Sequence, residues 1–165
     1  MKDYLNRKGK RNRYNTDETS YNCGGYALET YSWYYPYDDW DDIIDDVDCM
    51  FDDGYSIDEV NSTLIERFTD KILSDFPEYK VVNPDLIDNY SNLIAFRIGA
   101  DYTDYYDSYI EAFDYTFDFH FKKKINNKWY EKRGRQPIEE CNLVKNCPWE
   151  TTMNYYDSEI IYFAK

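Results

Sequence analysis

The sequence predicts an α+β fold, in which an early helix that carries a cysteine packs on an antiparallel sheet that carries a histidine. Apolar side chains recur at helical spacing over residues 23–35, and Pro36 ends this run. Apolar and polar residues alternate strictly around His120, which is typical of a half-buried strand. A chain of 165 residues is long enough for one domain with a hydrophobic core. We therefore expect a single domain over residues 21–165.

Residues 1–20 are polar and basic and show no periodicity, so they are predicted to form a flexible arm. The first thirteen residues contain six basic residues and one acidic residue. They carry +5 of the formal net charge of −14 and leave −19 on the rest of the chain. Such an acidic protein is not expected to bind nucleic acid directly, because phosphate neutralisation needs clustered Lys and Arg. The arm is either a solubilising tail or a segment that lies across an acidic surface or an anionic partner.

The sequence also bears on the location of the protein and on its need for a cofactor or a metal ion. No apolar run approaches the length of a membrane span, and residues 1–14 lack the apolar core of a signal peptide, so we expect a cytoplasmic protein without a membrane partner. No cofactor is implied. A zinc site is not expected either, because the single histidine and the spacing of the cysteines do not match one. The cysteines are Cys23, Cys49, Cys141 and Cys147.

The stretch around Cys23 has the features of a nucleophile at a helix start. Asn22 or Ser20 can cap a helix that begins near Cys23, where backbone N–H groups favour a thiolate. Gly24 and Gly25 have no side chains, so another group can approach the sulfur closely. We therefore predict that Cys23 is catalytic and that Asn22, Gly24 and Gly25 contact the substrate.

The middle of the chain is expected to be scaffold. Residues 38–53 are rich in Asp but fit no calcium loop, so they predict an amphipathic, solvated acidic helix or loop and not a metal site. Residues 56–59 form a capping box, and a long amphipathic helix should follow it and end before Pro77. Short strands are predicted at residues 81–82 and 93–98. The tyrosine-rich residues 101–115 are either a wide loop or a short helix.

The strand of His120 is predicted to continue into a hairpin. Asn126 and Asn127 make a fair two-residue turn, because Asn tolerates positive φ. With this turn Lys122 lies opposite Glu131, and Glu131 lies diagonally across from His120 on the same face. Trp129 falls on that face as well, and we predict that it contacts the substrate.

Two carboxylates compete to orient the imidazole of His120. Glu131 is within reach across the strands, and Asp118 lies on the same face two residues before the histidine. A third reading is that Glu131 only forms a cross-strand ion pair with Lys122. Register alone does not choose among them.

The hairpin and its exit form a basic strip in an otherwise acidic protein. The strip can be an electropositive rim that lowers the thiol pKa of Cys23 and favours acidic substrates, or it can be a charged edge that resists aggregation. Residues 159–164 are predicted to form an apolar strand inserted in the sheet. The strip consists of Lys122, Lys123, Lys124, Lys128, Lys132, Arg133 and Arg135.

Three segments resemble a known family: Asn22-Cys23-x-Gly25-Tyr26-Ala27-Leu28, Asp118-Phe119-His120-Phe121 and Trp129-x-x-Lys132-x-Gly134. The family is an uncharacterised group of papain-like cysteine peptidases from Gram-positive bacteria and their phages, related to the cell-wall peptidase branch. The resemblance implies a papain-like fold over residues 21–165 and the activity of a thiol protease. In that group a second histidine stands where this chain has Glu131. The resemblance therefore implies a Cys23-His120-Glu131 site.

The chemistry expected of this site is acyl transfer on a peptide or isopeptide bond of a peptide or protein substrate. His120 takes the proton of Cys23, the sulfur attacks the carbonyl, and the backbone N–H of Cys23 contributes to an oxyanion hole. A phage-encoded enzyme would act in the host cytoplasm. The alternative is a non-enzymatic acidic effector that inhibits a host defence or nucleic-acid-binding protein through its surface. A further alternative is a scaffold that assembles as a homo-oligomer.

Overall fold

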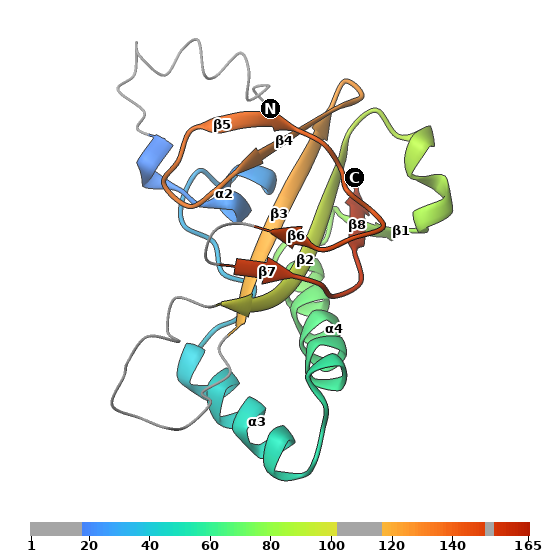
Figure 1. Ribbon diagram of the computed structural model, residues 1–165. Coiled ribbons are helices and arrows are strands. Elements are labelled where there is room, and N and C mark those ends of the chain that lie inside the picture. Colours follow the sequence, from blue (N-terminus) through green and yellow to red (C-terminus); the bar gives the residue numbers. More distant parts are fainter. Residues whose placement is uncertain (1–17, 102–116, 151–153) are drawn as a thin grey trace.

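The structure, a computed structural model, describes residues 18–101, 117–150 and 154–165 (Figure 1). Most of the predicted basic arm and nearly all of the tyrosine-rich stretch 101–115 lie outside these ranges. The described chain has an α+β fold, as the sequence predicts. Its antiparallel sheet has the strand order β1-β8-β2-β3-β4-β5, and β7 pairs with both β2 and β6. The strands are β1 (Lys80–Val82), β2 (Leu93–Asp101), β3 (Phe117–Ile125), β4 (Lys128–Lys132), β5 (Ile138–Cys141), β6 (Trp149–Glu150), β7 (Asn154–Tyr156) and β8 (Ile161–Ala164).

The predicted hairpin and its register are confirmed. Asn126 and Asn127 have φ values of 50° and 66°, which the turn requires. Lys122 pairs with Glu131 across β3 and β4. The C-terminal strand is also confirmed, because β8 lies between β1 and β2.

The cysteine helix is much shorter than the sequence predicts. Helix α2 (Cys23–Ala27) has five residues instead of the expected run to residue 35. Glu29 and Tyr31 adopt positive φ values of 63° and 55°, and the N–H of Tyr31 donates to the carbonyl of Gly25 at 3.1 Å. The chain therefore folds back over its own helix, and this tertiary closure overrides the helical spacing of the apolar residues.

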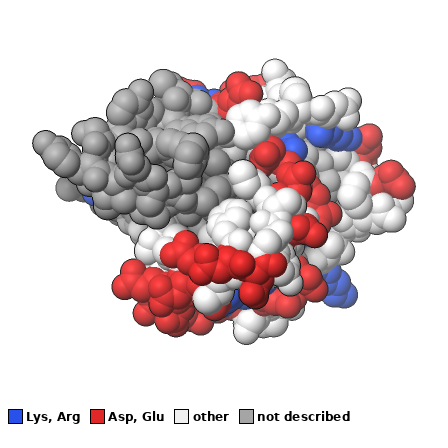
Figure 2. Space-filling model, turned by 60° about the horizontal axis from the view of Figure 1, so that its bottom comes forward, with Lys and Arg blue, Asp and Glu red and all other residues white. Residues whose placement is uncertain are grey.

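The two remaining α-helices match their predictions. Helix α3 (Trp40–Asp52) is an amphipathic acidic helix that buries Ile43 and Val47. Figure 2 shows acidic side chains gathered on the face that includes the bottom of Figure 1, where α3 lies. Helix α4 (Ile57–Asp75) begins at the predicted capping box of Ser56 and Glu59. Two short 3-10 helices complete the described chain: η1 (Glu18–Ser20) and η2 (Pro84–Asn89).

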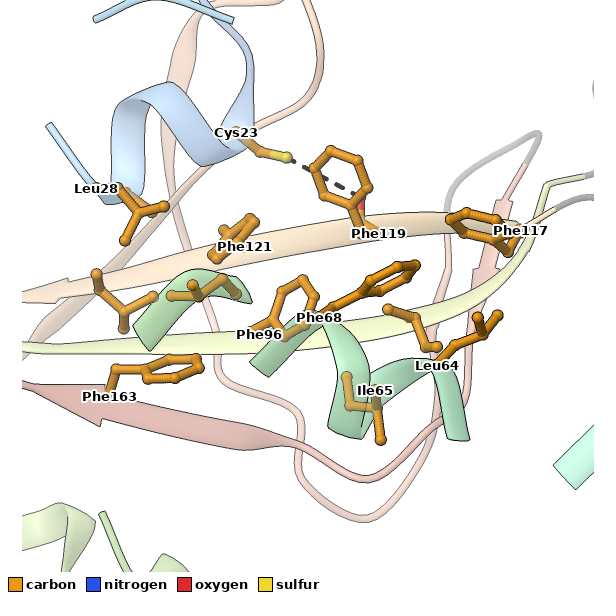
Figure 3. Packing of buried hydrophobic residues seen from close by; sticks show 14 of the residues in the cluster. Cys23, Leu28, Leu64, Ile65, Phe68, Phe96, Phe117, Phe119, Phe121 and Phe163 are labelled. Atoms are coloured by element: carbon orange, nitrogen blue, oxygen red, sulfur yellow. Dashed lines mark hydrogen bonds between the residues drawn. The ribbon is translucent and has the colours of Figure 1, made fainter. Parts of the chain in front are cut away.

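The main core fills the space between the sheet and the helices. Phe117, Phe119 and Phe121 of β3 point to this side, as their alternation predicts, and Phe68 of α4 packs against them (Figure 3). Cys23 belongs to the same cluster. A second, smaller cluster lies on the opposite face of the sheet and includes Trp149 and Tyr156. The side chains of β3 therefore alternate between the face that packs on the helices and the opposite face of the sheet.

Candidate active site

Asn22 fixes the start of the cysteine helix. Its side-chain oxygen accepts hydrogen bonds from the backbone N–H groups of Gly25 at 3.0 Å and Tyr34 at 3.1 Å, and its amide nitrogen donates to the carbonyl of Tyr34 at 2.8 Å. The residue is 4 % exposed. The side chain of Asn22 is thus the N-cap of α2 and also anchors the following loop. A contact between Asn22 and a substrate stays a prediction.

The glycines after Cys23 allow close packing within the chain itself. A Cβ atom on Gly25 would lie 1.8 Å from the carbonyl oxygen of Ser32, and one on Gly24 would lie 3.0 Å from Cδ1 of Tyr34. Gly25 therefore needs to be glycine for reasons of internal packing, whereas an added methyl group at Gly24 would press on Tyr34. An approach of the substrate to either glycine also stays a prediction.

The thiol of Cys23 is buried against a backbone carbonyl. Its Sγ donates a long hydrogen bond of 4.0 Å to the carbonyl of Phe119 (Figure 3). Burial, and then the negative charge of Asp118, raise the pKa of Cys23 to about 12, although the backbone N–H groups of Phe121 and Gly24 oppose the shift. The expected low thiol pKa is therefore wrong for the substrate-free protein. A helix of five residues supplies too little positive potential to offset the burial.

His120 is held on the opposite face of β3. It is 4 % exposed, and its ring stacks on Tyr156 at a centroid distance of 5.3 Å and meets the edge of Trp149 at 6.2 Å. Nε2 of His120 lies 2.9 Å from Oε2 of Glu131. Because Glu131 occupies Nε2, Nδ1 is the ring nitrogen that is left for proton transfer.

Glu131 is the carboxylate that contacts the imidazole. Burial alone would raise its pKa, but the hydrogen bond and charge of His120, with the charges of Lys122 and Arg133, outweigh burial and hold the pKa of Glu131 at about 2. Lys122 lies 3.9 Å and Arg133 2.9 Å from its oxygens. The orienting contact and the cross-strand ion pair, which the sequence sets against each other, thus coexist. Asp118 accepts instead from the hydroxyl of Tyr156 at 2.5 Å.

Cys23 and His120 line one cavity of about 440 Å³. The pairing of β3 with β4 begins at Lys122, so β4 does not pair with the preceding residues of β3. One of these residues is Phe119, whose carbonyl accepts the hydrogen bond from the thiol of Cys23. The cavity lies at this edge of β3 and is lined by side chains from both faces of the strand. Among the described residues no hydrogen bond joins the thiol to the imidazole. The rest of the cavity is lined by Asn22, Trp33, Tyr35, Tyr37, Trp40, Phe117, Asp118, Phe119, Arg133, Gly134 and Tyr156.

Four lysines of the basic strip are internal, so they form neither the exposed electropositive rim nor the charged edge, the two alternatives that the sequence leaves open. Lys122, Lys123, Lys124 and Lys132 are each at most 7 % exposed. Their ammonium groups bind, in turn, the carbonyl of Asn142, the carboxylate of Glu29, the carbonyl of Ile87 and the carbonyl of Gly134. Their aliphatic stems fill space in the sheet while the charged heads reach fixed oxygens. A preference for acidic substrates stays a prediction.

Trp129 does not join the other predicted site residues. It packs against the second hydrophobic cluster and pairs across the strands with Lys124 and Cys141. It lines neither of the cavities that contain His120.

Tyr156, which stacks on His120, is not predicted from the sequence, because it reaches the histidine only through the pairing of β7 with β2. The stretch 33–40 is conspicuous in the sequence, because five of its eight residues are aromatic.

Within the described ranges, no helix has the length and apolar character needed to cross a membrane. The same part of the chain contains no group of three or more His, Cys, Asp or Glu residues that could hold a metal ion. Comparison of the whole chain with models of protein families, with curated proteins and with solved structures finds no match. The function must therefore be argued from the geometry and chemistry of the site.

Proposed function

We propose that this chain is a papain-like cysteine hydrolase that cleaves a peptide or isopeptide bond by acyl transfer through Cys23 and His120. The observation that carries the proposal is the buried hydrogen bond between His120 and Glu131, together with the cavity that the histidine shares with the only fully buried cysteine thiol. The bond orients the ring and leaves Nδ1 as the base. The order of helix, cysteine and later histidine strand is also the order that the resemblance implies.

The reaction begins with the protonated thiol of Cys23. When a substrate enters the cavity, the Cys23 thiol leaves the carbonyl of Phe119 and transfers its proton to Nδ1 of His120 as the sulfur attacks the carbonyl carbon. Glu131 stabilises the imidazolium that forms. Cys23 is the first residue of α2, so its backbone N–H has no acceptor within the helix and can bind the oxyanion.

The intermediate then divides into two products. The C–N bond breaks, and the leaving amine takes the proton from His120, which leaves the acyl group on Cys23 as a thioester. Water gives a proton back to His120 and attacks the thioester carbon. The acid leaves, and the thiol regains its proton. No metal or cofactor takes part in this sequence. We propose that it operates in a cytoplasm, which is the host's if a phage encodes the protein.

The test is cleavage of a mixed peptide library with fluorogenic amide leaving groups. We expect turnover by the wild-type chain, loss of at least a hundredfold in Cys23→Ala and His120→Ala, and loss of about tenfold or more in Glu131→Gln. Cys49→Ala is the matched control, because that thiol is exposed and should leave the rate unchanged. Turnover that survives in Cys23→Ala would contradict the proposal, and so would a wild-type chain that cleaves nothing.

A second function is favoured by one specific observation. The thiol of Cys23 is buried and neutral, whereas the acidic face of α3 is open to solvent (Figure 2). These features fit a non-enzymatic effector that binds a basic host protein through α3. The two functions separate by variants of the whole chain. If Cys23→Ala loses the effect of the protein on the host, the enzyme is supported. If a variant with Asp41, Asp42 and Asp45 changed to Asn loses that effect, the effector is supported.

A further inference from the structure

The imidazole of His120 needs a support besides Glu131. One hydrogen bond of 2.9 Å joins Nε2 of His120 to Oε2 of Glu131. The torsion that turns a histidine ring about its Cβ–Cγ bond has broad minima, so a single hydrogen bond leaves the plane of the ring free to rock. Proton transfer from Cys23 to Nδ1 requires a defined orientation of the ring. The second support has to come from groups that pack on the ring itself.

Tyr156 packs on a face of this imidazole. The centroids of the two rings lie 5.3 Å apart and the ring planes are 28° from parallel, which is a stacked arrangement. Trp149 approaches the imidazole differently, with its ring plane at 85° and its centroid at 6.2 Å. Tyr156 also lines both cavities that contain His120. The stacked tyrosine therefore restrains the plane of the imidazole, which the hydrogen bond to Glu131 does not.

The side chain of Tyr156 is itself fixed at both ends. Its hydroxyl donates to Oδ2 of Asp118 at 2.5 Å. Its backbone pairs with Gly99 of β2 and with Trp149 of β6. Strand β7 comes this close to β2 because Gly99 has no side chain: a Cβ atom there would lie 1.8 Å from the carbonyl oxygen of Tyr155 and 2.6 Å from Cα of Tyr156. The sheet and Asp118 together set the position of the tyrosine ring.

Asp118 reaches the imidazole through this tyrosine. Gly99 pairs with Asp118 on one side of β2 and with Tyr156 on the other, so the three residues form one row across the sheet. The hydroxyl of Tyr156 connects the two ends of the row. Asp118 lies two residues before His120 in β3 and on the same face of that strand. In this arrangement Asp118 holds a hydroxyl of the protein, and its carboxylate does not have to be open to a ligand.

We propose that Tyr156 is a positioning residue of the hydrolase, which holds the plane of the His120 ring and so keeps Nδ1 in place to receive the proton of Cys23. Asp118 fixes Tyr156 through its hydroxyl. The inference rests on the proposed function. It gives the two carboxylates that compete in the sequence different tasks: Glu131 binds the imidazole directly, and Asp118 acts on it through Tyr156.

The stacked tyrosine also acts during the reaction. His120 becomes a cation when it takes the proton of Cys23, and the face of an aromatic ring attracts a cation within about 6 Å of its centroid. The hydrogen bond from the Tyr156 hydroxyl to a carboxylate increases the electron density of the ring and strengthens this attraction. The ring of Tyr156 should therefore accelerate acylation more than it improves the binding of substrate.

The first test observes the imidazole directly and needs no substrate. His120 is the only histidine of the chain, so isotope-labelled histidine gives one set of ring signals in NMR spectra of the full chain. Order parameters report ring motion on the picosecond to nanosecond timescale, and relaxation dispersion reports motion on the microsecond to millisecond timescale. We expect an ordered ring in the wild type. In Tyr156→Leu the order parameters should fall or dispersion should appear.

Tyr162→Leu is the matched control. Tyr162 is buried in the same hydrophobic cluster as Tyr156, but it lines neither cavity that contains His120. Its loss should destabilise the fold and leave the motion of the imidazole unchanged. Circular dichroism establishes that each variant is folded. If the imidazole loosens equally in Tyr162→Leu and Tyr156→Leu, the effect is one of general packing and the positioning role is overturned.

Two milder variants test the part of Asp118. Tyr156→Phe keeps the ring and loses the hydroxyl, and Asp118→Ala removes the acceptor of that hydroxyl. Each should loosen the imidazole less than Tyr156→Leu does. The double variant should loosen it no more than either single variant, because both changes break the same bond. Effects that add in full would show that Asp118 acts by another route and would overturn this part of the proposal.

The second test is kinetic. With a peptide that the wild type cleaves, the rate of acylation in Tyr156→Leu should fall about tenfold, because the imidazolium loses its stacked ring. The affinity for the same peptide, measured in the Cys23→Ala background, should change less than threefold. Tyr162→Leu should keep the wild-type rate. A loss in Tyr156→Leu that lies entirely in affinity would make Tyr156 a substrate contact and contradict the positioning role.

Failure of this inference differs from failure of the proposed function. An imidazole that is equally ordered in the wild type and in Tyr156→Leu overturns the positioning role even if the wild-type chain cleaves peptides. An imidazole that loses its order in Tyr156→Leu, in a chain that cleaves nothing, supports Tyr156 as the support of the ring and removes the hydrolase.

Discussion

The reactivity of Cys23 toward iodoacetamide in the absence of substrate follows from its surroundings. Thiolates react and thiols do not. With a pKa of about 12, the thiol of Cys23 is ionised to roughly one part in 10⁴ at pH 8, against about a quarter for an ordinary thiol of pKa about 8.5. This difference lowers the rate by a factor of about 2,000. The higher intrinsic nucleophilicity of a more basic thiolate restores roughly 40-fold of it.

The net expectation is that Cys23 reacts about 50-fold more slowly than an ordinary exposed thiol at pH 8, and burial slows it further. Its rate should rise about tenfold per pH unit up to pH 9.5, without a plateau. In Asp118→Asn the rate should increase, because a charge that raises the pKa of Cys23 is gone. Alkylation is followed by mass spectrometry of the digested protein, with exposed Cys49 as the internal reference.

A rate for Cys23 that exceeds that of Cys49 at pH 7, or that levels off below pH 8, would refute this reasoning. Such a profile would mean that the substrate-free protein already holds a thiolate paired with protonated His120. The Phe119 carbonyl would then not be the partner of the sulfur.

Three other predictions concern stability. The carboxyl of Glu131 has a folded-state pKa of about 2 against an ordinary 4.5, so it should contribute about 3 kcal/mol to the free energy of unfolding above pH 4.5, and this contribution is lost as the pH falls toward 2. Urea titrations across this window should show that the free energy of unfolding of Glu131→Gln depends less on pH, and a pH dependence equal to that of the wild type would contradict the assignment. Gly25→Ala should destabilise by about 3 kcal/mol, because its methyl group would overlap the backbone of Ser32. Gly24→Ala should cost less in the same denaturation assay, because the nearest atoms, Cδ1 and the carbonyl oxygen of Tyr34, lie 3.0 and 3.2 Å away. Phe68→Ala should cost about 4 kcal/mol, because the side chain is fully buried between α4 and the sheet, and a loss below about 1 kcal/mol in thermal melts would place it outside the core.

Local chemistry explains which elements the sequence predicts well. The capping box of Ser56 and Glu59 satisfies the orphan N–H groups of its own helix, so it marks the start of α4 without help from the rest of the fold. Asn126 and Asn127 tolerate positive φ, which fixes both the turn and the register of β3 with β4. That register brings Glu131 to His120, so the contact between them follows from short-range rules.

Elements that depend on distant contacts are harder to predict. The helix of Cys23 ends early because the loop through Ser32 closes on Gly25, and helical spacing alone does not report such a closure. The burial of Lys123 and Lys124 depends on oxygen acceptors that other segments supply, Glu29 and Ile87, so the lysines in the sequence suggest a surface charge that the fold does not have. Tyr156 reaches His120 from the far end of the chain.

The most direct test of the hydrolase is to trap the acyl-enzyme. The wild-type chain is mixed with the peptide library, quenched in acid within milliseconds to seconds, and digested for mass spectrometry. The proposed reaction predicts a transient thioester on Cys23 that carries the acyl fragment of a cleaved peptide, that is absent in His120→Ala and that forms more slowly in Glu131→Gln. Cleavage without any adduct on Cys23, or an adduct that forms equally fast without His120, would contradict it.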